Sequence, residues 1–149
     1  MYKRQVCTAE GLLRIKDDPN SPVALKLTLK SAGVKDGVQL HAEIENKSAA
    51  PYKLLVCPGG HLCCVEGLHP LVAYDNTGMG LCDFCKTKPH CAQEKTLASK
   101  ASYPLDIAIP TNRLPEKCRK PGKTFSVLLC FELGENKLVH SNTIEVELK

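Results

Sequence analysis

Residues 23–45 read VALKLTLKSAGVKDGVQLHAEIE, and this stretch carries the clearest secondary-structure signal in the chain. Apolar and polar residues alternate over 23–30, and the alternation returns after the glycine-bounded turn Gly33–Gly37. A period of two is typical of strands that bury one face. The residues expected to face the core are Val23, Leu25, Leu27, Leu29, Val38, Leu40, Ala42 and Ile44. The stretch therefore predicts a hairpin, or two paired strands, at the start of the fold.

The same period recurs along most of the remaining chain, separated by turn residues such as Gly134 to Lys137. No segment shows a convincing helical period. Seven or eight short strands without a helix predict an all-β fold built from two antiparallel sheets. The alternating sets are Tyr52, Leu54 and Val56; Tyr103, Leu105, Ile107 and Ile109; Phe125, Val127, Leu129, Phe131 and Leu133; and a last strand with Leu138, His140, Ile144, Val146 and Leu148.

Composition is that of one ordinary globular domain over residues 1–149, with 43% hydrophobic and 24% charged residues and no Trp. A chain of this length buries roughly 68–70% of the surface of its unfolded form, so it does not need crosslinks for a core. The net charge of +4 is scattered, which argues against nucleic-acid binding, since such binding needs a concentrated basic stripe. No apolar run has the ~18–20 residues of a membrane span. No signal peptide is present at the N-terminus, which fits a cytosolic protein or a mature fragment.

Two segments resemble immunoglobulin-like and fibronectin-like sandwiches of bacterial envelope proteins. They are ALKLTLKSAGVKDGVQLHAEIENKS at 24–48 and PGKTFSVLLCFELGENKLVHSNTIEVELK at 121–149, where a Pro-Gly precedes one strand and a Ser-Asn enters the last. The resemblance covers about half of the chain. It implies an antiparallel immunoglobulin-like sandwich of 7–8 strands and leaves the function open.

Six of the nine cysteines fall between residues 57 and 91, spaced C-x5-C-C-x17-C-x2-C-x5-C. They occupy the one long interruption of the regular strand pattern, at about 58–92, which we interpret as a cysteine-rich insertion. Within it, Leu71–Tyr74 is predicted as a strand and residues 75–78 as a turn. Disulfides are the first interpretation, because closing a loop of ~15 residues stabilises by roughly 3 kcal/mol. Six cysteines allow fifteen pairings, and neighbouring cysteines rarely pair with each other. The candidates are Cys57, Cys63, Cys64, Cys82, Cys85 and Cys91, which leaves Cys7, Cys118 and Cys130 outside the set.

Zinc is the alternative interpretation of the same cluster. Cys82 and Cys85 have the C-x2-C spacing that lets two thiolates occupy one edge of a tetrahedron. The second pair of ligands would come from His61, Cys63, Cys64, His90 or Cys91. The upstream cysteines do not form a second matched knuckle, so spacing alone leaves both interpretations open.

No catalytic signature accompanies the cluster: the chain has no G-x-S-x-G elbow, P-loop or H-E-x-x-H motif. His41 is expected in solvent, and His140 is expected as a hydrogen-bonded core or rim residue. Asn46-Lys47-Ser48 has the form of a glycosylation acceptor. We therefore expect a non-enzymatic, extracytoplasmic (periplasmic or secreted) domain without a cofactor, which binds or scaffolds a protein partner through a disulfide-stapled loop region.

Overall fold

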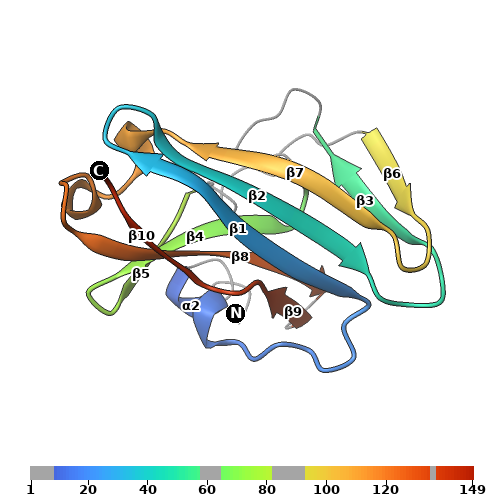
Figure 1. Ribbon diagram of the computed structural model, residues 1–149. Helices are drawn as coiled ribbons and strands as arrows, with labels where there is room; N and C mark the ends of the chain where they lie inside the picture. Colours follow the sequence, from blue (N-terminus) through green and yellow to red (C-terminus); the bar gives the residue numbers. More distant parts are fainter. Residues whose placement is uncertain (1–8, 58–64, 82–92, 135–136) are drawn as a thin grey trace.

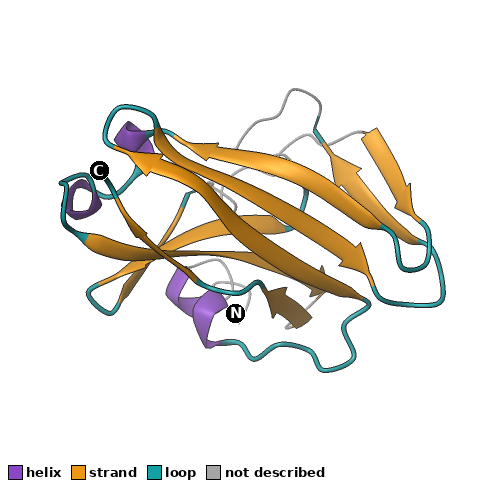
Figure 2. Ribbon diagram, in the orientation of Figure 1, coloured by secondary structure: helices purple, strands orange, loops and turns teal. Residues whose placement is uncertain are grey.

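The computed structural model describes residues 9–57, 65–81, 93–134 and 137–149 (Figure 1). This part of the chain is mostly β, with antiparallel pairing throughout (Figure 2). Its elements are α2 (Ala9–Arg14), β1 (Val23–Gly33), β2 (Gly37–Asn46), β3 (Tyr52–Val56), β4 (Leu68–Tyr74), β5 (Thr77–Gly80), β6 (Gln93–Leu97), β7 (Ser102–Ile109), two 3-10 turns (Thr111–Arg113 and Glu116–Cys118), β8 (Thr124–Gly134), β9 (Lys137–His140) and β10 (Ile144–Glu147).

One sheet has the order β1-β2-β7, and the predicted pairing of the first two strands is confirmed. The turn between them depends on Gly37, whose φ of 74° is costly for residues with a Cβ. Leu29 is an exception to the predicted inward face. It is 36% exposed, next to a register shift between Leu29 and Ser31.

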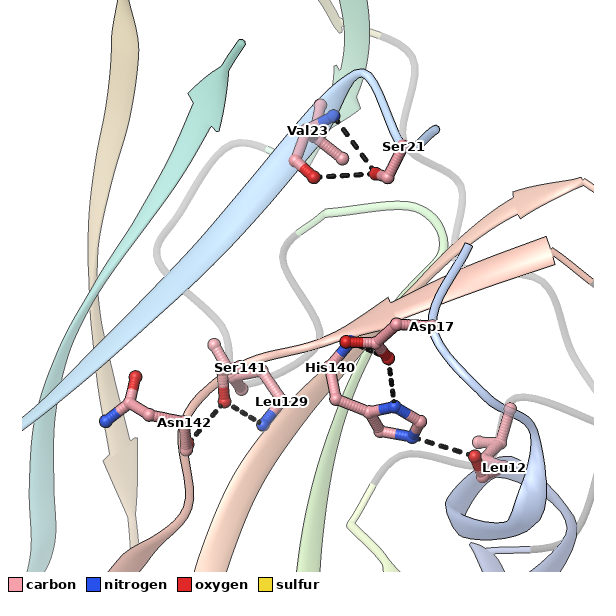
Figure 3. Close-up of polar contacts among 8 residues, drawn as sticks. All are labelled: Leu12, Asp17, Ser21, Val23, Leu129, His140, Ser141 and Asn142. Atoms are coloured by element: carbon pink, nitrogen blue, oxygen red, sulfur yellow. Dashed lines mark hydrogen bonds and ion pairs between the residues drawn. The ribbon is translucent and has the colours of Figure 1, made fainter. Parts of the chain in front are cut away.

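The second sheet has the order β10-β8-β4-β5, and β9 also pairs with β8. Cys130 of β8 pairs with β4 on one side and β9 on the other, while Val127 pairs with β4 and β10, so β9 and β10 lie along the same edge. The prediction of one continuous last strand is wrong, because Ser141 interrupts it. Its hydroxyl accepts a hydrogen bond from the backbone N–H of Leu129 at 2.8 Å (Figure 3).

The main core lies between the two sheets. It is formed by the alternating apolar residues of β1, β2 and β7 on one side and of β4, β8 and β10 on the other. Asn142, between β9 and β10, joins the sheets with polar contacts. Its side chain accepts from the N–H of Leu27 in β1 and donates to the C=O of Leu27, each at 2.8 Å. A single amide thus takes the place of a neighbouring strand at this point of the β1 edge.

The expectation of a chain without a helix is wrong, because α2 packs on the outer face of the second sheet. Leu12 is fully buried there against Leu71, Leu128 and Leu138. A helix of six residues is far too short to be stable alone, so tertiary contacts hold it. No described helix is long and apolar enough to cross a membrane.

The segment 58–92 is not one continuous loop inserted into the fold. Residues 65–81 contain β4 and β5, and β4 lies between β8 and β5 in the second sheet. The β4–β5 turn has positive φ at both central residues, Asp75 (46°) and Asn76 (62°), which is the geometry of a tight hairpin. The cysteine-bearing residues therefore fall into two separate segments, 58–64 and 82–92, on either side of this hairpin.

Candidate functional site

Most of the sequence-predicted site residues lie outside the described part of the chain. These are His61, Cys63, Cys64, Cys82, Cys85, His90 and Cys91, so both the disulfide set and the zinc set stay predictions. Cys57 is described and is disulfide-bonded. No disulfide joins two described cysteines, and Cys118 and Cys130 are free and buried.

β3 and β6 pair with each other in a third, two-stranded sheet, the β3–β6 ribbon. The described residues that flank the two cysteine-bearing segments meet at the end of this ribbon. Val56 pairs with Gln93 in the ribbon and also forms an isolated bridge with Val65. The N–H of Glu66 donates to the C=O of Leu55 at 2.8 Å, which fixes the same junction. Segment 58–64 thus starts and ends beside the point where segment 82–92 ends.

The start of segment 82–92 is held at the neighbouring hairpin. Leu81 is buried, and its N–H donates to the C=O of Pro70 in β4 at 3.0 Å. The guanidinium of Arg113 donates to the C=O of Leu81. Backbone and side-chain contacts therefore fix all four junctions.

A second cluster of titratable residues crosses strands β4, β8 and β9 of the second sheet. His69 in β4, Cys130 in β8 and His140 in β9 are register partners, so their side chains form one row on the face covered by α2. His69 lies with its Nε2 3.6 Å from a carboxylate oxygen of Glu132. Burial, and then the charges of Glu132 and Asp17, raise the pKa of Cys130 to about 12.

His140 makes the best-defined contacts in this row (Figure 3). Its Nδ1 lies 2.6 Å from Oδ1 of Asp17, and its Nε2 lies 2.8 Å from the C=O of Leu12 in α2. The backbone N–H of His140 donates to the same Asp17 oxygen at 2.9 Å. The prediction of a hydrogen-bonded rim histidine is confirmed.

A cavity of about 480 Å³ lies between the β4–β5 turn and the connection that leads into β8. Its walls combine lysines with carboxylates, and Cys118 is buried beside it. Burial, and then the charge of Asp75, raise the pKa of the Cys118 thiol. The lining residues are Tyr74, Asp75, Glu116, Lys117, Cys118, Lys120, Lys123 and Thr124.

These arrangements do not favour catalysis by the described residues. Raised pKa values keep the thiols of Cys118 and Cys130 protonated at neutral pH, whereas the thiolate is the nucleophile. Both ring nitrogens of His140 already face oxygen atoms, of Asp17 and of Leu12, so the ring is engaged in contacts within the fold. No group of three or more His, Cys, Asp or Glu among the described residues could hold a metal ion.

The row of His69, Cys130 and His140 was not predicted from the sequence. The three residues are separated by 61 and 10 positions, and only the register of three strands brings them together. A period of two fixes the face on which each residue of a strand lies but still allows register shifts of two residues, so the sequence contained no direct signal for the row.

No protein-family model and no curated protein matches this chain. Among solved structures it is similar to a β-glucosidase from Listeria innocua in complex with glucose, at 11% identity and a TM-score of 0.48, over 85% of this chain and 16% of that one. It is also similar to Spo0M, the sporulation control protein from Bacillus subtilis, at 8% identity and a TM-score of 0.46, over 87% of this chain and 50% of that one.

A third similar structure is the alkylpurine DNA glycosylase AlkC of Pseudomonas fluorescens bound to DNA containing an abasic site analog. The identity is 14% and the TM-score 0.49, over 99% of this chain and 36% of that one. The chain thus spans half or less of each of these proteins. The similarities are remote ones to β-rich structures, and they assign no family.

Proposed function

We propose that the chain is a non-enzymatic binding or scaffolding domain of an extracytoplasmic compartment, which presents disulfide-stapled segments 58–64 and 82–92 to a protein partner. Within this proposal the fold is an immunoglobulin-like sandwich. The sheet orders β1-β2-β7 and β10-β8-β4-β5 support it, because they follow the A-B-E and G-F-C-C′ strand orders of such domains.

The observation that carries the proposal is the meeting of three segment junctions at Val56. Val56 pairs with Gln93 and bridges to Val65. Both ends of segment 58–64 and the C-terminal end of segment 82–92 therefore join the described chain beside Val56. Cys57, the next residue, is disulfide-bonded. Crosslinked segments on a rigid sheet lose little conformational entropy on binding, which favours recognition.

The remaining cysteines support a role without catalysis. Cys118 and Cys130 are both buried, with raised pKa values, and each packs as a small apolar residue. The stapled segments would then supply the binding surface while the sheets supply rigidity.

A zinc site remains the second candidate function. The observation in its favour is the C-x2-C spacing of Cys82 and Cys85, with His61, Cys63, Cys64 or Cys91 completing a tetrahedron. The disulfide of Cys57 favours the first candidate.

Intact mass with alkylation, together with metal analysis, distinguishes the two. We expect the unreduced, fully denatured chain to react only at Cys118, Cys130 and any other thiol outside bridges, and to be lighter by about 2 Da per bridge. Peptide mapping should find Cys57 in a bridge. Stoichiometric zinc, with all nine cysteines alkylated after chelation, would instead establish the metal site and contradict the stapled domain.

The binding role is tested by exchanging one segment at a time, because deleting 58–92 would also remove β4. Replacing 82–92 with a Gly-Ser linker of equal length should abolish binding of an extracytoplasmic partner that cross-links to the wild-type chain. The matched control replaces 119–122, an exposed turn that precedes β8, and should bind normally. Equal binding by both variants would refute presentation by the cysteine-bearing segments.

A further inference from the structure

The two ring nitrogens of His140 both face hydrogen-bond acceptors. Nδ1 lies 2.6 Å from a carboxylate oxygen of Asp17, and Nε2 lies 2.8 Å from the C=O of Leu12. A carbonyl oxygen has no proton to give, and an ionised carboxylate has none either. A neutral imidazole carries one N–H, so it can satisfy only one of these two acceptors. Only the doubly protonated ring donates to both.

These contacts join β9 to the segment that covers the outer face of the second sheet. Leu12 belongs to α2, and Asp17 follows α2 by three residues. Asp17 also accepts from the N–H of His140, and the N–H of Asp18 donates to the C=O of Leu138. Beneath the helix lie Leu71, Leu128, Cys130 and Leu138, all buried. A helix of six residues has no stability of its own, so its position depends on these contacts.

We propose that His140 is a proton-dependent latch for α2: the protonated ring holds the helix on the sheet, and loss of one ring proton releases the helix and exposes the apolar face beneath it. The inference is independent of the proposed binding function.

The sign of the effect follows from the groups around the ring. Asp17 is the only described carboxylate within ion-pair distance of His140, and only the doubly protonated ring can donate to it and to the C=O of Leu12 at once. The latch is therefore closed at low pH and opens as pH rises. The other charged or titratable groups on the surrounding elements are Glu10 and Arg14 on α2, Lys16 and Asp18 beside Asp17, Lys137 on β9, Cys130 and Glu132 on β8, His69 on β4 and Lys26 on β1.

NMR on the intact chain tests the latch directly. Nitrogen-15 spectra report the protonation of each ring nitrogen, and methyl NOEs between Leu12 and Leu138 report the position of α2. Across a pH titration of the folded chain we expect the NOEs to fall together with the change in the nitrogen-15 shifts that reports the loss of one ring proton from His140. The docking equilibrium should weaken roughly tenfold or more, as for loss of a hydrogen bond to a charged group.

Two variants separate the latch from general effects of pH. His140→Gln and Asp17→Asn should each abolish the pH dependence of the NOEs, and Asp17→Asn retains the ring if the first variant fails to fold. The matched control is His41→Gln, since His41 also contacts a carboxylate, that of Asp106, on the exposed face of the other sheet. His41→Gln should keep the full pH dependence. Constant NOEs in the wild-type chain, or NOEs that change while His140 keeps one protonation state, would overturn the proposal.

Discussion

Replacing Asn46 with Ala is the perturbation that tests most sharply how the sheets are held together. Asn46 is fully buried at the end of β2. Its Nδ2 donates to the C=O groups of Ala50 (2.8 Å), Leu97 (3.0 Å) and Ala98 (3.2 Å), and its Oδ1 accepts from the N–H (3.0 Å) and the hydroxyl (2.7 Å) of Ser48. One side chain thus ties the β2–β3 connection to the β6–β7 turn. The same burial makes Asn46 unavailable as a glycan acceptor in the folded chain.

The expected cost follows from these contacts. Nδ2 has two N–H donors for three carbonyl oxygens, so one N–H is shared between two of them. With the two bonds that Oδ1 accepts, about four hydrogen bonds are lost in the Ala variant. Each contributes about 0.5–1.5 kcal/mol net. Several of the freed partners are only partly buried and can bind water, which places the expected loss at about 3 kcal/mol. Asn46→Asp should cost more, because it directs a carboxylate at three carbonyl oxygens.

Urea unfolding under non-reducing conditions measures this loss as a lower midpoint with an unchanged slope. Asn112→Ala, at an exposed position in a 3-10 turn, is the matched control and should change stability by less than about 0.5 kcal/mol. A loss below about 1 kcal/mol for Asn46→Ala, or Asn46→Asp as stable as the wild-type chain, would refute the network as described.

Three further predictions concern the turn, the junction between the sheets and the buried thiol. Gly37→Ala should lower the free energy of unfolding by at least about 2 kcal/mol, because φ is 74° and the new Cβ would lie 2.1 Å from the carbonyl oxygen of Ile109. Gly122→Ala has a similar φ but open space around it, so the loss in the same urea assay should be only about 1 kcal/mol. Asn142→Ala should cost about 2 kcal/mol through its two bonds to the β1 backbone, and Asn142→Asp, which keeps the acceptor, should differ from it measurably. The pKa of Cys130, about 12 against 9.0 for an ordinary thiol, makes its thiolate about a thousandfold scarcer in the folded chain, so iodoacetamide at pH 8 should label it at least that much more slowly than in urea. The pKa of Cys130 is higher in the folded chain than in the unfolded chain, so its contribution to stability is complete below pH 9 and is lost as pH rises from about 9 to 12. Cys130→Ala should therefore lose less stability over this pH range than the wild-type chain.

The strands that could be predicted are those with one buried and one wet face. β1, β2 and β7 alternate in sequence and bury mostly the same alternate residues, for example Leu105, Ile107 and Ile109 in β7. β8 was predicted from the alternate residues of its core face, although Leu128 and Cys130 on its other face are buried as well. The presence of a second layer also follows from this alternation, because an alternating strand must bury its apolar face against another layer.

Elements that lack this contrast were predicted only in part or missed. β4 is buried on both faces, against the core and against α2, so the run Leu68–Val72 shows no alternation and only its second half, Leu71–Tyr74, was predicted as a strand. β6 is the opposite case, with four exposed residues and only Leu97 buried. α2 is held by the burial of Leu12 rather than by helix propensity, and six residues are too few for a periodic signal.

The sequence shows the cysteine cluster but not where its flanking residues lie in the fold. Cysteine spacing indicated crosslinking or metal binding, and the disulfide of Cys57 agrees with the first. Spacing could not show that Val56 pairs with both Gln93 and Val65, because that depends on long-range strand pairing. The row through Cys130 depends on register in the same way.

The position of β4 changes what crosslinks in this region would do. A disulfide in a peripheral insertion restrains only the insertion. Here the two cysteine-bearing segments enclose β4 and β5, and β4 pairs with six consecutive residues of β8 from Ser126 to Phe131. A bridge between the segments would close a loop that contains β4 and β5, and it would lower the entropy of the unfolded chain. The crosslink would therefore stabilise the second sheet itself. Reduction should then loosen the pairing of β4 with β8 together with the segments, so that any binding surface and the sheet beneath it would respond to oxidation as one unit.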